Sequence, residues 1–255
     1  APTRDNGIYH NRVKVGRRDL PEVFGRVDGS IADYGFGPAA DYAVADRYYP
    51  PELFTDGQGE MHWRRHVLYL KSARPEGANG FVMRDTFPGG EQRRKWWSWL
   101  NLDDADRIAV DGQGFAALER NKVFAENEMP MKRGSTVEMK TAFGASTWFG
   151  FSRPCEVRIR MTFDYGVQGS VPSGKETKTI VEIPAAAGED FFYVVFPRGG
   201  EEPVPACVPF GADGMKITTA EGTDYVFLAD RPTAVERDEV VFAGKAGAVR
   251  VSADR

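Results

Sequence analysis

The sequence is poor in the side chains that most often bind transition metals or form covalent catalytic intermediates. Among its 255 residues there are 3 histidines and 2 cysteines. Cys155 and Cys207 belong to no CxxC motif and to no Cys/His cluster, which argues against thiol catalysis and against a cysteine-based zinc site. One disulfide and two inert core thiols both fit this pair.

Long apolar runs and an excess of positive charge are also missing. No run of about 18 apolar residues occurs, and residues 1–7 contain no hydrophobic signal core. A net charge of -4 gives no indication of the basic surface that binding to a phosphate backbone requires. We therefore expect neither nucleic acid nor a membrane as a partner. Because the chain opens at Ala1 and not at Met, we expect a mature or trimmed product.

Helical periodicity is scarce as well, and alternation of side chains takes its place. Residues 60–71 form the clearest case, with Trp63 on one face of an extended strand and Arg64 on the other. Shorter strand-like runs follow at 81–85, 96–102, 156–163, 178–183, 191–196, 225–228 and 249–251. Strands and turns recur about every 8 to 12 residues, the spacing of a sandwich or barrel. The sequence predicts an all-β fold: a large antiparallel two-sheet β-sandwich of the supersandwich type, with little helix.

Two proline-containing breaks, at 183–188 and 202–205, suggest how the chain is divided. We expect residues 1–200 to form the main β-sandwich. Residues 201–255 would supply closing strands or a small C-terminal β-sheet of the same unit.

His62 and His66 are spaced like a helical metal motif, but they lie on a predicted strand. Residues i and i+4 of a strand are about 13 Å apart, so the two cannot share one ion. Together with Arg64 they indicate either a partly solvated polar face or a cationic surface for a carboxylated sugar. In the second case Arg64 or Arg65 would bind a uronate through two hydrogen bonds.

Aromatic residues offer a second set of candidate sugar contacts. Trp97 and Trp99 follow a run of cations and share one strand face, so they can form either a stacking platform or part of the core. Tyr48 precedes Pro50 and Pro51 in a predicted loop. It can reach a cleft, or it can pack locally with its hydroxyl exposed.

Three stretches, taken in order, carry a family resemblance. The first is the step His10-Asn11 before a short strand, and the second is the arginine-containing strand 63–70 followed by a strand ending in Arg84-Asp85. The third is the tryptophan-rich strand 96–102. In this order they resemble the C-terminal β-sandwich portion of heparinase II/III-like polysaccharide lyases, and they are similar to alginate and oligo-alginate lyases.

The resemblance implies a sandwich that normally follows an N-terminal α-helical toroid domain, which is missing from this chain. It implies β-elimination on an acidic polysaccharide or oligosaccharide containing uronic acid, with His10 and Asn11 as catalytic residues. It also makes His10 a possible zinc ligand in the full-length enzyme. Since a tetrahedral zinc site needs three or four protein ligands, we expect no zinc in this chain alone. The alternative for His10 is a hydrogen bond to backbone or water.

The leading hypothesis is therefore the β-sandwich portion of a secreted or periplasmic bacterial polysaccharide lyase, inactive without its helical half. The alternatives are a non-catalytic carbohydrate-binding or structural β-sandwich module and a module that binds another protein through an exposed sheet edge.

Overall fold

The computed structural model describes most of the chain. The described residues are 12–15, 29–53, 59–72, 74, 77–88, 96–103, 105–114, 131–141, 143–163, 177–199, 202–238 and 240–253. They form sixteen β-strands and one short 3-10 helix, η2 (Pro51–Leu53). None of the helices in this part of the chain could span a membrane.

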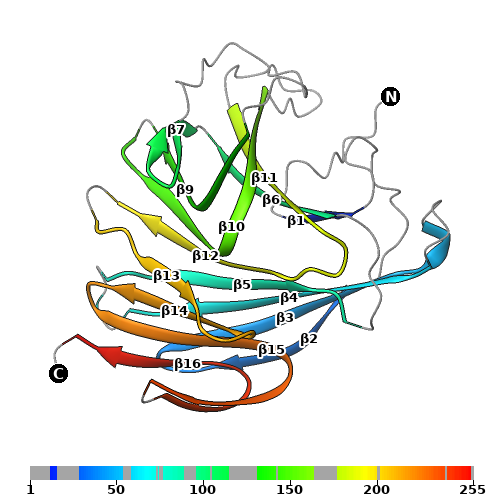
Figure 1. Ribbon diagram of the computed structural model, residues 1–255, viewed down its shortest axis with the longest axis vertical. Coiled ribbons are helices and arrows are strands. Elements are labelled where there is room, and N and C mark those ends of the chain that lie inside the picture. Colours follow the sequence, from blue (N-terminus) through cyan, green and yellow to red (C-terminus); the bar gives the residue numbers. More distant parts are fainter. Residues whose placement is uncertain are drawn as a thin grey trace.

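Twelve strands form one large sheet in which all pairs are antiparallel (Figure 1). They are β1 (Arg12–Val15), β2 (Gly29–Phe36), β3 (Ala40–Tyr49), β4 (Met61–Leu70), β5 (Gly80–Thr86), β6 (Trp96–Asp103), β7 (Ala105–Val110), β8 (Gln113–Gly114), β9 (Met131–Thr141), β10 (Ser146–Phe163), β11 (Thr177–Ala185) and β12 (Phe191–Arg198). The main path runs β1-β6-β11-β10-β12-β5-β4-β3-β2, and β9 joins β7 and β8 to β10.

Four further strands form the second sheet, in the order β13-β14-β15-β16. Their bounds are β13 (Ala206–Pro209), β14 (Gly214–Thr219), β15 (Gly222–Arg237) and β16 (Val240–Ser252). The prediction of an all-β fold with two antiparallel sheets is confirmed.

The longest strand, β10, has three neighbours. Its first part pairs with β12, its last part pairs with β11, and β9 runs along its other edge. The register with β9 shifts between Gly150 and Cys155, and Pro154 lies inside this irregular section. Proline has no N–H to donate and is tolerated where the ladder is interrupted. The bulge thus lies between the part of β10 that pairs with β12 and the part that pairs with β11.

The large sheet buries one face in a first core. Strands β11 and β12 both pair along the edge of β10 opposite β9, which places β6, the next neighbour of β11, close to β12. The rings of Trp96 on β6 and Phe191 on β12 accordingly have centroids 6.1 Å apart. Side chains from β6, β7, β9, β10, β11 and β12 bury one another in this core.

Strand β12 separates this first core from a second one. Phe191 and Tyr193 belong to the first core, whereas Phe192 and Val194 pack against Met215 and other residues of the second sheet. The nearly continuous apolar run 191–196 follows from burial on both faces. In a simple two-layer sandwich, only one face of β12 would be buried.

Arg84 of β5 anchors the second sheet to the first. Its Nη1 donates to Asp213 Oδ1 and to the Leu228 carbonyl, and its Nη2 donates to Asp190 Oδ2, all at 2.5 Å. The arginine side chain is 10% exposed. Charge-assisted hydrogen bonds from one planar group thus fix β5 against β15 and two neighbouring loops.

The turn between β7 and β8 has the backbone of a two-residue hairpin. Asp111 and Gly112 both have positive φ, 47° and 74°, as such a turn requires.

Cys155 and Cys207 are both free thiols. Of the two alternatives that the sequence left open, the pair of free thiols is therefore correct, and the disulfide is not formed.

Candidate functional site

A row of polar side chains lies on one face of β3 and β4. In the antiparallel register, Asp46 is opposite Arg64 and Tyr48 is opposite His62, so alternate residues of both strands share this face. Asp230 of β15 reaches the same face from the second sheet. We call this set the β3–β4 polar cluster: Tyr42, Asp46, His62, Arg64, His66 and Asp230.

Arg64 joins the two carboxylates of the cluster. Its Nη2 donates to Asp46 Oδ2 at 2.8 Å, and its Nη1 donates to Asp230 Oδ1 at 3.0 Å. Burial works to lower the pKa of Arg64, but these hydrogen bonds raise it above its ordinary value. The side chain is 22% exposed, so the guanidinium retains an accessible surface while its position is fixed.

His66 connects Tyr42 to Asp230. The ring Nε2 lies 3.1 Å from Asp230 Oδ1, and the ring Nδ1 lies 2.9 Å from the Tyr42 hydroxyl. Because an ionised carboxylate only accepts, Nε2 donates to Asp230, and Nδ1 shares a hydrogen bond with the Tyr42 hydroxyl. Tyr42, His66 and Asp230 form a continuous hydrogen-bonded relay.

The electrostatics of the relay keep Tyr42 protonated, so its hydroxyl can donate a hydrogen bond but is a poor base. Burial, helped by Asp33 and Asp230, raises the pKa of Tyr42 to about 12. Burial would also raise the pKa of Asp230, but hydrogen bonds from His66 and Arg64 bring it below its ordinary value. At neutral pH Tyr42 is therefore a neutral phenol and Asp230 is a carboxylate. With its ring nitrogens occupied and the residue 1% exposed, His66 is closed to solvent.

At the exposed end of the cluster, His62 lies beside Tyr48. His62 Nε2 lies 2.8 Å from Asp46 Oδ1, and its ring meets the Tyr48 ring edge-on with centroids 6.1 Å apart. The Tyr48 hydroxyl donates to Glu60 Oε2 at 2.5 Å, and this hydrogen bond raises the pKa of Tyr48. Together with Arg64, these side chains can bind hydroxyl or carboxyl groups of a ligand.

Two of the predicted substrate contacts, Arg64 and Tyr48, thus lie along one surface. Tyr48 was predicted in a loop, but it belongs to β3, because the β3–β4 pairing continues to Tyr49 and Met61. Arg65 lies on the opposite face. There its Nε and Nη2 donate to Asp85 at 2.8 and 2.9 Å, beside Trp63, whose Nε1 donates to the same carboxylate.

For the other predicted site residues, the structure gives less. Trp97 and Trp99 lie in β6, opposite Lys14 and Arg12 of β1, and only their backbone is described. His10 and Asn11 lie outside the described residues. Within the described part of the chain, no three His, Cys, Asp or Glu side chains gather as metal ligands. A zinc site at His10 stays a prediction.

Sequence reasoning missed three members of the cluster: Tyr42, Asp46 and Asp230. The first two share a period of two with Tyr48, and this pattern could have placed them on the Arg64 face once β3 was extended. Asp230 lies 164 residues from His66 and gave no such signal. Only the contact between the two sheets brings it here.

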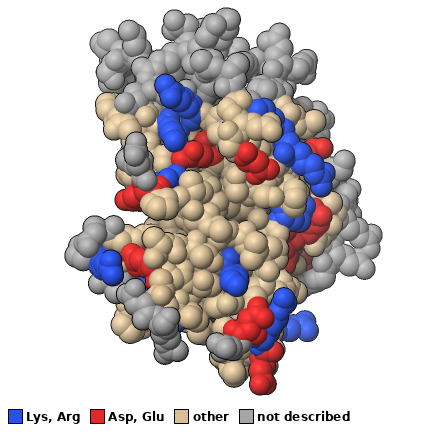
Figure 2. Space-filling model, turned by 60° about the vertical axis from the view of Figure 1, so that its left-hand side comes forward, with Lys and Arg blue, Asp and Glu red and all other residues tan. Residues whose placement is uncertain are grey.

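Charges on the surface are mixed in sign. On the face displayed in Figure 2, basic and acidic side chains lie next to one another with uncharged surface between them. The β3–β4 polar cluster is mixed in sign as well, because Arg64 pairs with two carboxylates.

Comparisons with known proteins identify the fold. The chain matches heparan sulfate lyase HepC from Pedobacter heparinus with a TM-score of 0.51 and 12% identity, over 88% of this chain and 30% of that one. This is a shared fold. Heparinase III matches with a TM-score of 0.46 and 10% identity, over 85% of this chain and 29% of its own. No family model matches the chain.

Two curated proteins match in sequence over part of the chain. Mycofactocin maturase MftC of Mycolicibacterium smegmatis is 27% identical over 114 residues, which is 44% of this chain and 29% of that protein. MftC of Mycobacterium ulcerans is 30% identical over 114 residues, or 44% of this chain and 31% of that protein. The chain thus spans about a third of the length of these relatives, and each match covers less than half of this chain.

Proposed function

We propose that this chain is the β-sandwich portion of a polysaccharide lyase that cleaves a uronic-acid glycan by β-elimination. The observation that carries the proposal is the fold shared with heparan sulfate lyase HepC over 88% of the chain. The motif order at His10-Asn11, at strands 63–70 and 81–86 and at strand 96–102 supports it independently. We further propose a secreted or periplasmic bacterial setting, where such glycans are met.

The reaction requires three things of the protein. The C6 carboxylate of the sugar must be neutralised, the C5 proton removed and the leaving O4 protonated. We assign His10 and Asn11 to this chemistry. Arg64, Tyr48, Trp97 and Trp99 would hold the substrate. Arg64 is the better uronate ligand because its side chain is 22% exposed, against 10% for Arg65 on the other face.

The relay behind Arg64 has a positioning role in this proposal. Asp46 and Asp230 fix the guanidinium, and Tyr42 with His66 fixes Asp230. Since the pKa of Tyr42 is raised to about 12, this tyrosine is a poor base, and the base comes from elsewhere. We propose that it comes from an α-helical toroid domain, on the same polypeptide or supplied in trans. The chain covers 30% of HepC, which leaves room for such a domain there.

An assay for the unsaturated uronate product tests the proposal. The chain alone should give no rise in ultraviolet absorbance on alginate or heparan sulfate, whereas the chain with its toroid domain should. His10→Ala should remove that activity, and Arg133→Ala, at an exposed position of β9, should retain most of it. Turnover by the chain alone would refute the assignment of the base to another domain.

A non-catalytic carbohydrate-binding module is the second candidate. It predicts glycan binding that His10→Ala leaves unchanged, and no product with any toroid domain. That outcome would overturn the lyase proposal.

A further inference from the structure

A pocket of about 380 Å³ opens between the two sheets, away from the β3–β4 polar cluster. It lies at the end of β12, beside the β14–β15 turn and the end of β16. Gly222, at the start of β15, precedes Asp230 by eight residues, or about 26 Å of extended strand at about 3.3 Å per residue. The pocket and the cluster are therefore separate sites.

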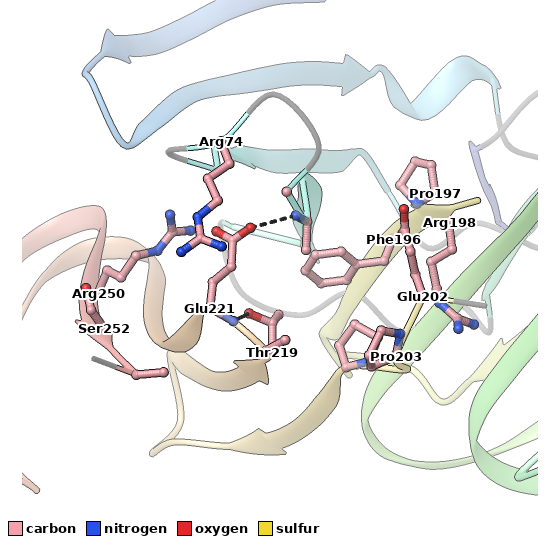
Figure 3. A pocket seen from close by; sticks show the side chains of 15 residues that line it. Arg74, Phe196, Pro197, Arg198, Glu202, Pro203, Thr219, Glu221, Arg250 and Ser252 are labelled. Atoms are coloured by element: carbon pink, nitrogen blue, oxygen red, sulfur yellow. Dashed lines mark hydrogen bonds between the residues drawn. The ribbon is translucent and has the colours of Figure 1, made fainter. Parts of the chain in front are cut away.

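The walls of the pocket differ in character. Figure 3 shows Arg74, Glu221 and Arg250 on one side, with Phe196 and Pro203 facing them. Pro197 and Pro205 add to the apolar wall. A ligand in this space meets charged hydrogen-bonding groups on one side and apolar carbon surface on the other.

The polar wall is held in place by hydrogen bonds of Glu221 and Arg250 to neighbouring residues. Glu221 accepts hydrogen bonds from Ser72 Oγ at 2.8 Å and from the Ala78 amide at 3.1 Å. Arg250 donates through Nε to Asp224 Oδ1 at 2.7 Å and through Nη1 to the Lys71 carbonyl at 2.8 Å. Side chains fixed in this way keep the pocket open and cost little entropy on binding.

Other polar groups of the pocket are uncommitted. Among the described residues, the Arg74 guanidinium and the Glu202 carboxylate form no hydrogen bond or ion pair, and both residues are exposed. Arg198 is held in the wall by the hydrogen bond from its Nη1 to Glu138. A donor group, Arg74, and an acceptor group, Glu202, are thus available beside one apolar surface.

We propose that this pocket binds one or two sugar units of a glycan through their hydroxyl groups. Hydroxyls both donate and accept, as the pair of Arg74 and Glu202 requires. The C–H faces of a sugar ring suit the wall of Phe196 and Pro203. The volume is within the range of small-ligand sites, about 300 to 1,000 Å³. Arginine and glutamate line the pocket together, so hydroxyl recognition, and not net charge, defines the ligand class.

Ligand-observed NMR and calorimetry on the chain, with D-glucose and D-glucuronic acid as probes, test the proposal. Binding of both sugars is the expected result. Tighter binding of glucuronic acid would identify an acidic glycan as the source, and tighter binding of glucose a neutral one. Absence of binding by either sugar would overturn the proposal.

Variants locate the binding to the pocket. The double variant Arg74→Ala, Glu202→Ala should weaken binding at least about tenfold, because hydrogen bonds to charged groups are lost. Ser252→Trp should block the pocket without removing either group. Arg133→Ala, at an exposed arginine of β9, is the matched control. Unchanged binding in the first two variants would refute this site. The result is independent of the lyase proposal, because it needs neither His10 nor a toroid domain.

Discussion

Arg65 of β4 and Asp85 of β5 stand directly opposite each other in the strand register, joined by hydrogen bonds of 2.8 and 2.9 Å. The Asp85 side chain is 0% exposed and the Arg65 side chain 10%. Trp63 Nε1 donates to the same carboxylate at 2.9 Å. The buried Asp85 carboxylate thus accepts hydrogen bonds from two side chains of β4, Trp63 and Arg65.

Removal of this acid should be strongly destabilising. In Asp85→Ala, Arg65 is left as a buried charge without its carboxylate, and we expect the free energy of unfolding to fall by about 3–5 kcal/mol in urea titrations. The double variant Arg65→Met, Asp85→Leu should lose less, because no unpaired charge remains. Equal losses in both variants would show that packing, and not the pair, sets the stability.

Asp230 should make stability depend on acidic pH. Its pKa is below its ordinary value in the folded protein, so its contribution is full above the unfolded pKa of about 3.9 and is lost as pH falls further. Asp230→Asn should reduce stability at pH 7 and flatten the loss between about pH 5 and 2. Thermal melts across this range measure the effect. Asp238→Asn, at an exposed ion pair, should leave the profile unchanged.

Arg64 should matter more for ligand binding than for folding. Because its side chain is 22% exposed, Arg64→Ala should lower the free energy of unfolding by only about 1 kcal/mol. Under the proposed function it should weaken binding of a uronate oligosaccharide at least about tenfold. Calorimetry on this variant and on Arg133→Ala separates the two effects. Equal binding by both would remove Arg64 from the substrate site.

Gly80 is packed against a core ring. A Cβ at this position would lie 2.5 Å from Phe196 Cε1, so Gly80→Ala should cost about 1–3 kcal/mol through overpacking. Gly114→Ala is the matched control, because no atom lies within 4 Å of a Cβ there. Denaturant midpoints of the two variants provide the comparison. A midpoint for Gly80→Ala equal to that of Gly114→Ala would contradict the tight contact.

The free thiols should be inert in the folded protein. Burial raises the pKa of Cys155 to about 11 and that of Cys207 to about 12, so little thiolate is present at pH 8. Alkylation by iodoacetamide should be slow in buffer and complete in guanidinium chloride, as followed by mass spectrometry. Rapid alkylation under native conditions would contradict this burial.

The local elements could be predicted from the sequence, since they depend on alternation and turn residues. The strand at 60–71 is confirmed as β4, and the Asp111-Gly112 turn closes a hairpin. Alternation also separated Arg64 from the Trp63 face. It could not show that His66 is buried, because that depends on Asp230 in the second sheet.

The features that the sequence did not predict depend on packing between residues far apart in the chain. The contact of Trp96 with Phe191 depends on β10 pairing with two strands along one edge, and no local pattern encodes this pairing. The pocket likewise draws its walls from five separate segments. Arg74 and Glu202 become neighbours of one cavity only after both sheets are in place.

The double burial of β12 has a mechanical consequence. Since Phe191 and Tyr193 fill one core while Phe192 and Val194 fill the other, neither core can open without exposing the back of this strand. The two cores should therefore melt in a single cooperative transition. Phe196, near the end of the same strand, extends that cooperativity to the wall of the pocket, so a ligand there would stiffen both halves of the molecule at once.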